Sequence, residues 1–153
     1  MRMNQITRLP EFSIVVFALL LNYPWEFLQV PLFEGMPEAR HWDAIRACPR
    51  ATLGDAVITL IAYWCVSFAT RSRDWLMSPN ISRILMFAGT GVLITIAIER
   101  LALDGRWLGG WQYSVLMPIV PGIEVGLSPL LQWIVLPPIV AWFSRRHLRG
   151  SAI

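Results

Sequence analysis

The sequence predicts an all-α membrane protein: a bundle of four transmembrane helices with a short re-entrant or interfacial segment before the last helix. Of the 153 residues, 56% are apolar and only 15% are charged, and the mean hydropathy is +0.53. This is too apolar for an ordinary soluble domain. Four continuous apolar runs also approach the roughly 20 residues that a helix needs to cross a hydrocarbon core of about 30 Å. We expect one membrane domain, 1–153, with helices at about 12–33, 51–70, 81–101 and 127–143.

The first apolar run contains the polar stretch NYPWEFLQVP. Ala18, Asn22, Glu26 and Gln29 recur every three or four positions, so they fall on one face of a helix. Pro24 lacks a backbone donor, which frees a carbonyl in the preceding turn and predicts a kink beside Glu26. We expect Asn22 or a neighbouring helix to supply the missing donor.

The other three runs carry similar polar stripes. Small and hydroxylated side chains in such stripes are ordinary packing residues between membrane helices. An ionisable group that faces lipid costs roughly 2.5 to 3.5 kcal/mol, so the acidic stripes are expected to turn toward the bundle axis. The stripes are Thr52, Asp55, Thr59, Tyr63 and Ser67 in the second run, Ala88, Gly91, Thr95 and Glu99 in the third, and Ser128 and Gln132 in the fourth.

Three acids and an amide are expected to meet near the extracytoplasmic side of the bundle. Counting about 1.5 Å per residue places Glu26 and Asp55 about 10 and 6 Å inside the ends of their helices. Glu99 lies near the same end, and Gln132 lies about 8 Å inside it. Carboxylates in one poorly hydrated site cannot all be ionised, so one of them becomes a proton donor unless a cation neutralises the group. The candidate counter-charges are Arg100 and Arg106.

The arginines predict that both termini face the cytoplasm. All 13 basic residues are arginine, and the cytoplasmic ends of membrane proteins carry the excess of basic residues. The four runs place one set beside the termini: Arg2, Arg8, Arg71, Arg73, Arg83, Arg145, Arg146 and Arg149. The smaller set lies at the other end: Arg40, Arg46, Arg50, Arg100 and Arg106.

Residues 111–133 read WQYSVLMPIVPGIEVGLSPLLQW, which proline and glycine break too often for a regular span. The segment is also too apolar for a free loop, so we expect a re-entrant or interfacial piece that covers the outer mouth of the bundle as a lid. Several tryptophans near the ends of the runs fit aromatic belts at the two membrane interfaces. They are Trp42, Trp107 and Trp111 on one side and Trp75 and Trp142 on the other.

Part of this region resembles a known family. Glu99, the sequence GRW at 105–107, Trp111, Tyr113 and the stretch LSPLLQW ending at Trp133 are similar to the pattern of the small integral-membrane lycopene cyclases and the related carotenoid hydratases. The resemblance implies acid-initiated chemistry on a polyene, with Tyr113 near the ligand. The first half of the chain is similar to small bacterial membrane proteins of unassigned function, which implies a bacterial inner membrane.

The chain departs from the cyclase pattern at one point. The paired glutamates that follow the proline in that family are replaced here by Leu130 and Leu131. The proton donor would therefore have to be Glu26, Asp55 or Glu99.

The leading hypothesis is a membrane protein that binds, or converts by acid catalysis, an apolar isoprenoid or lipid. Glu26, Asp55 and Glu99 are the candidate catalytic groups, the first two as acid and base. Asn22 and Gln132 would orient the ligand, and the rings of Trp25 and Trp133 would offer π-faces to a developing carbocation. Together with Tyr113 from the resemblance, these four residues are the candidate ligand-binding set.

Two other classes of function remain open. An accessory or assembly subunit of a larger membrane complex would use the polar stripes against partner helices, and a proton or ion pathway would use the polar face of the second helix. We expect no cofactor and no metal, because neither His41 nor His147 lies in a predicted span. The expected partners are the lipid bilayer, a lipophilic ligand and membrane subunits or further copies of the chain, with no nucleic acid, since the basic rim suits anionic lipid headgroups.

Overall fold

Four long helices form most of the protein. The structure is a computed structural model that describes residues 6–105 and 110–150. The helices are α2 (Pro10–Gln29), α3 (His41–Thr70), α4 (Ile81–Leu103) and α5 (Leu127–Gly150). By length and composition, each can cross a membrane. The prediction of a mainly helical bundle with four candidate membrane spans is therefore confirmed.

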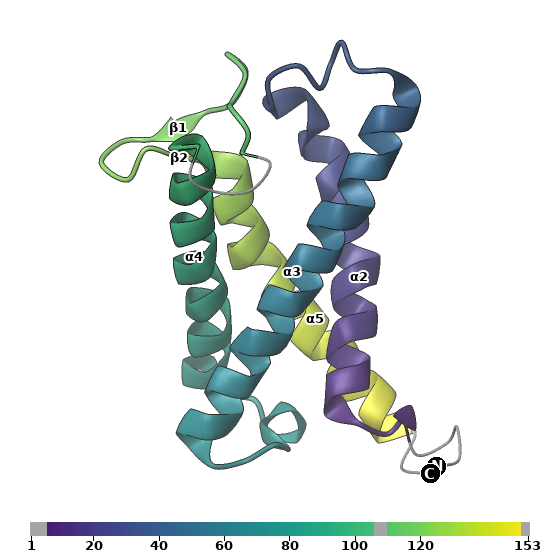
Figure 1. The fold of residues 1–153 in the computed structure, drawn as a ribbon. Coiled ribbons are helices and arrows are strands. Elements are labelled where there is room, and N and C mark those ends of the chain that lie inside the picture. Colours follow the sequence, from purple (N-terminus) through teal and green to yellow (C-terminus); the bar gives the residue numbers. More distant parts are fainter. Residues whose placement is uncertain (1–5, 106–109, 151–153) are drawn as a thin grey trace.

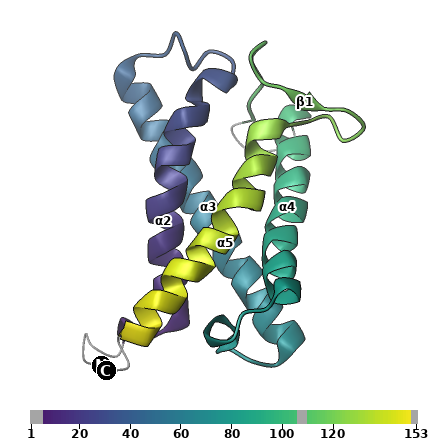
Figure 2. The ribbon, with the colours of Figure 1, turned by 180° about the vertical axis from the view of Figure 1, so that it is seen from behind.

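The helices run alternately in opposite directions, so neighbours in the sequence are antiparallel (Figure 1). α2 packs against α3 and α5, and α4 packs against the same two helices. α3 and α5 therefore lie on one diagonal of the bundle, and they cross in both views (Figures 1 and 2). At the end of the bundle where α2 begins and α5 finishes, His147 Nε2 lies 3.0 Å from the carbonyl oxygen of Thr7. We call this the terminal end and the opposite end the mouth end.

Two helices are longer than predicted. α3 begins at His41 rather than near 51, and it continues through Pro49. The apolar run begins only after this proline and the polar residues before it, but Asp43 in the first turn suits the positive end of the helix dipole. Arg40 Nε also donates to Asp43 Oδ2 at 3.1 Å. α5 continues past 143 to Gly150, where His147 and Arg149 occupy the last turn.

The apolar core lies toward the terminal end. It is built around Tyr63, Trp75 and Phe87, which are fully buried. The short helix η2 (Trp75–Met77) places the ring of Trp75 5.9 Å from that of Tyr63 and 5.5 Å from that of Phe87, measured between centroids. The prediction that Trp75 lies in an interfacial belt is therefore wrong, because the turn after α3 folds this side chain under the bundle. Tyr63 also donates its hydroxyl to the carbonyl of Arg73 at 2.7 Å.

At the mouth end, residues 111–114 lie beside the chain that follows α2 and pair with its backbone. We call this segment the strap. The backbone N–H of Glu34 donates to the carbonyl of Gln112 at 2.9 Å, and that of Ser114 donates to the carbonyl of Leu32 at 2.9 Å. The strap therefore pairs with the chain after α2, directly beyond the short helix η1 (Val30–Leu32).

After the strap, β1 (Ile119–Val120) and β2 (Val125–Gly126) form a small antiparallel hairpin that leads into α5. The irregular segment predicted here is therefore present, as a strap and a hairpin at the mouth end (Figure 1).

Candidate functional site

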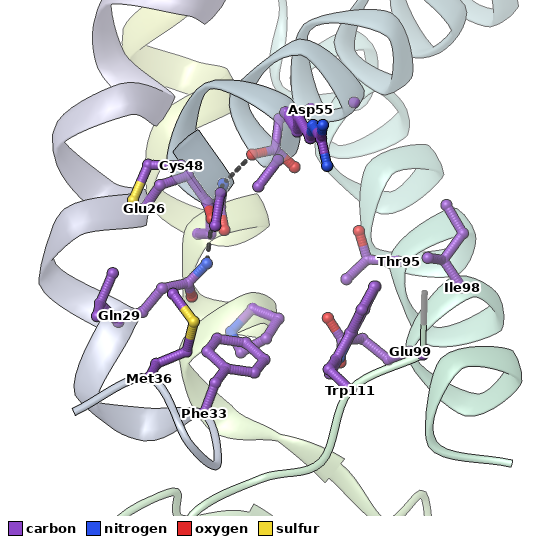
Figure 3. Close-up of a pocket in the computed structure, with 18 of the residues that line it drawn as sticks. Glu26, Gln29, Phe33, Met36, Cys48, Asp55, Thr95, Ile98, Glu99 and Trp111 are labelled. Carbon is purple, nitrogen blue, oxygen red and sulfur yellow. Dashed lines mark hydrogen bonds between the residues drawn. The ribbon is translucent and has the colours of Figure 1, made fainter. Parts of the chain in front are cut away.

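A partly open cavity of about 820 Å³ lies at the mouth end, between the helices. All four long helices and the strap contribute to its walls. Figure 3 shows Glu26 and Gln29 on one side of the cavity and Glu99 and Trp111 on the other. The acids and amides that line it from the four helices are Glu26, Gln29, Asp55, Glu99 and Gln132.

Gln132 is the centre of the first polar group in this cavity. Its Nε2 lies 2.7 Å from Asn22 Oδ1, 2.9 Å from Asp55 Oδ2 and 3.3 Å from Glu26 Oε1. One amide nitrogen carries two hydrogens, so three acceptors on two helices compete for them. The carboxyl groups of Glu26 and Asp55 therefore lie close to each other, because both contact the same nitrogen. We call Asn22, Glu26, Asp55 and Gln132 the acid–amide cluster.

Further amides support this cluster from the α2 side. Gln29 Nε2 donates to Glu26 Oε1 at 2.8 Å, and Ser128 Oγ donates to Gln29 Oε1 at 3.0 Å. Asn22 Nδ2 donates to the carbonyl of Ala18 at 2.8 Å. Asn22 is therefore not the donor for the carbonyl freed by the proline, because its amide donates one turn back along its own face; a donor from a neighbouring helix stays a prediction.

The second polar group surrounds Glu99. Its Oε2 accepts a hydrogen bond from Trp111 Nε1 at 2.9 Å and another from the Tyr113 hydroxyl at 2.5 Å. The backbone N–H of Gly126 donates to the same Tyr113 hydroxyl at 3.0 Å. Burial and the hydrogen bond to the carboxylate raise the pKa of Tyr113 above its ordinary value. We call Glu99, Trp111 and Tyr113 the Glu99 cluster, which ties the strap and the hairpin to the end of α4.

Among the described residues, no basic side chain forms an ion pair with Glu26, Asp55 or Glu99. The ion pairs within 6–105 and 110–150 are Arg40–Asp43, Arg73–Glu11 and Arg100–Glu124. The expectation that Arg100 neutralises the cavity acids is therefore wrong, since its guanidinium turns toward the hairpin. Arg106 and Trp107 lie outside the described residues. Arg50 lines the cavity as an exposed side chain.

Trp133 forms an apolar wall of the cavity and packs tightly on α4. A Cβ atom built at Gly91 would lie 1.9 Å from Cε3 of Trp133, far inside van der Waals contact. Glycine at this position therefore lets the indole approach the α4 backbone. Gly91 was expected to be a packing residue, and this contact gives the reason.

The structure brings together most of the predicted site residues. Glu26, Asp55, Glu99, Gln132 and Trp133 all line the one cavity. Asn22 and Tyr113 lie behind this lining and are hydrogen-bonded to it.

Trp25 differs from the other predicted residues, because it is not among the residues that line the cavity. Its Nε1 is buried and has no hydrogen-bond partner among the described residues.

Two residues in contact with the acids were not in the predicted set. Gln29 belongs to the same stripe as Glu26, one turn further along, so the spacing could have identified it. Trp111 was assigned to an interfacial belt, but it lines the cavity and its indole donates to Glu99. Its position two residues before Tyr113 was the available signal.

Fold and site together define a class: a four-helix bundle, with helices able to span a membrane and an acidic cavity at one end. No group of three or more metal-binding side chains occurs among the residues that the structure describes. Among known proteins, no family model, no curated protein and no solved structure matches the chain.

Proposed function

We propose that this chain is an integral membrane protein that binds an apolar isoprenoid or another lipid in the mouth-end cavity. The acid pair Glu26–Asp55 would then supply a proton to the bound molecule. One observation carries the proposal: two carboxyl groups that share one amide donor line a cavity whose other walls are largely apolar.

The size and lining of the cavity support a small lipophilic ligand. Binding sites for small molecules typically measure about 300 to 1,000 Å³ and combine apolar walls with a few polar groups. The volume here, about 820 Å³, lies within that range. Phe33, Trp111 and Trp133 add aromatic faces to the lining.

The acid pair supports proton transfer as the chemistry. Two carboxyl groups that contact the same amide nitrogen in a poorly hydrated cavity retain one proton between them, because charging both at that separation is costly. An acid that stays protonated beside an apolar ligand can act as a general acid. The similarity to membrane lycopene cyclases points in the same direction, since acid-initiated chemistry on a polyene needs such a group.

The two other classes of function receive less support. An accessory subunit would direct polar faces at partner helices, but the hydroxyls of Thr52, Thr59 and Ser67 donate to carbonyls of their own helix. A proton or ion pathway would need a polar route to the terminal end. The core between the cavity and that end is filled by Ile14, Tyr63 and other fully buried side chains.

The orientation forms part of the proposal. With both termini in the cytoplasm of a bacterial inner membrane, as the arginine distribution favours, the cavity opens toward the extracytoplasmic side. The strap and hairpin would then lie at that interface as an interfacial or re-entrant lid.

Co-purification of lipid tests the proposal. The chain, its Glu26→Gln variant and a Glu38→Gln control would be expressed, purified in mild detergent and analysed for bound lipids by mass spectrometry. Glu38 is exposed and lies outside the cavity lining, so the control removes the same charge elsewhere. We expect a lipid enriched in the wild type and the control and depleted in Glu26→Gln. Identical lipid profiles in all three samples would contradict the proposal.

A further inference from the structure

Most of the donors beside the cavity acids are already engaged by the protein. Gln132 donates to the acid–amide cluster, and Gln29 donates to Glu26. Across the cavity, Trp111 and Tyr113 both donate to Glu99. The two acidic walls therefore offer few free N–H or O–H groups to a ligand beside the carboxylates.

Acceptor capacity, in contrast, remains unused. Asp55 accepts through Oδ2 and Glu99 through Oε2, and their other oxygens, Oδ1 and Oε1, accept no hydrogen bond from the described residues. A carboxylate has about four lone-pair sites. These acids line the cavity from two different helices, α3 and α4, so the free acceptors face its interior from more than one side.

The lining of the cavity is also rich in acidic residues, so its charge favours a positively charged ligand. Glu26, Asp55, Glu99 and Glu34 line the cavity, and Arg50, exposed at its surface, is the one basic residue in the lining among the described residues. A buried carboxylate without a counter-ion is costly, and a ligand with the opposite charge offsets this cost.

Three aromatic rings complete the pattern. Phe33, Trp111 and Trp133 line the same cavity. The faces of such rings attract cations, most strongly where water is excluded. Carboxylates with free acceptors and aromatic faces in one apolar cavity together suit a positive charge on an apolar body.

We propose that the lipid bound in this cavity has a cationic head group rich in hydrogen-bond donors, an alkylammonium, which lies between the acid–amide cluster and the Glu99 cluster. This inference rests on the proposed lipid-binding function and names the class of ligand. The same walls would stabilise a positive charge that develops on a ligand during acid-catalysed chemistry.

Binding of such a ligand depends on pH with a defined sign. The titratable groups that face the head group are Glu26 on α2, Cys48 and Asp55 on α3, and Glu99 on α4, with Arg50 and Glu34 near the surface. The lining contributed by α5 includes Gln132 and Trp133, which do not titrate. Protons and the ammonium compete for the same carboxylates, so affinity falls as the pH is lowered.

Three lipids of equal chain length test the inference. Decylamine, decanol and decanoate carry positive, neutral and negative heads, and their binding to the protein in nanodiscs would be measured by equilibrium dialysis against empty nanodiscs. The samples would be the wild type, Asp55→Asn, and Glu38→Gln as an exposed control with the same loss of charge. The folding of each sample would be checked by its thermal unfolding.

We expect saturable binding of decylamine, at least about tenfold tighter than binding of decanol, which corresponds to roughly 1.4 kcal/mol. Asp55→Asn should weaken decylamine binding about tenfold or more, whereas Glu38→Gln should leave it unchanged. Decanol binding saturably and as tightly as decylamine would overturn the inference while leaving the proposed function standing. Saturable binding of none of the three lipids would overturn both.

Discussion

Replacing Gln132 by leucine removes the donor that connects three helices. Gln132 Nε2 lies 2.7, 2.9 and 3.3 Å from acceptors on Asn22, Asp55 and Glu26, and the residue is only 3% exposed. Its two hydrogens make two full bonds at a time. Hydrogen bonds between membrane helices contribute about 0.6 and at most about 1.7 kcal/mol each, so two bonds amount to roughly 1 to 3 kcal/mol. We expect the upper part of this range, because buried acceptors are left without a donor.

The assay is reversible unfolding by sodium dodecyl sulfate in mixed micelles, followed by tryptophan fluorescence. Gln112→Leu is the matched control, since this amide is exposed and donates to the carbonyl of Leu103 at 3.1 Å. Water replaces an exposed bond, so the control should change the free energy of unfolding by less than about 0.5 kcal/mol. A Gln132→Leu protein as stable as this control would refute the assigned network.

Two further substitutions test the packing and the strap. Gly91→Ala should lower the free energy of unfolding by about 1 to 3 kcal/mol, because the new methyl group overlaps Trp133. The control Gly89→Ala places its methyl group in open space and should be neutral or stabilising. Equal effects of the two substitutions would contradict the contact between Gly91 and Trp133. The raised pKa of Tyr113 keeps its proton on the folded state above about pH 10, where the unfolded state releases it, so the folded protein loses stability there. Tyr113→Phe lacks this group, so the variant should lose less stability than the wild type above about pH 10. Unfolding measured from neutral to alkaline pH checks this, and parallel curves for both proteins would count against it.

Spacing along single helices was sufficient to find the acid–amide cluster. Asn22 and Glu26 share a face of the first helix because they are four residues apart. Since exposing acids to lipid is costly, this face and Asp55 were predicted to point toward the bundle axis. The alternating direction of four spans then placed Gln132 at the same level. Local periodicity and one rule about lipid were enough here.

Other features depend on contacts that no local pattern encodes. Trp25 is adjacent to Glu26 in the sequence, but neighbours on a helix point about 100° apart, so it falls outside the cavity lining. Trp75 and Trp111 both looked interfacial, although one is folded into the core and the other donates to Glu99. These positions depend on how the loops after α3 and α4 turn, and apolar composition does not specify that.

The beginning of α3 was missed for a related reason. Its first turns are polar and contain Pro49, so they extend beyond the apolar run that a membrane span requires. Hydropathy reports how much of a helix suits lipid, and the helix itself continues wherever its backbone can be satisfied.

A double-mutant cycle on Glu26→Gln and Asp55→Asn tests most directly whether these two carboxyl groups act as a pair inside the bundle. Each single variant and the double variant would be unfolded in the same mixed micelles. If the two groups share a proton and the amide of Gln132, their effects on the free energy of unfolding should deviate from additivity by about 1 kcal/mol or more. Additivity within about 0.3 to 0.5 kcal/mol, the behaviour of distant sites, would contradict a shared acidic centre in the cavity.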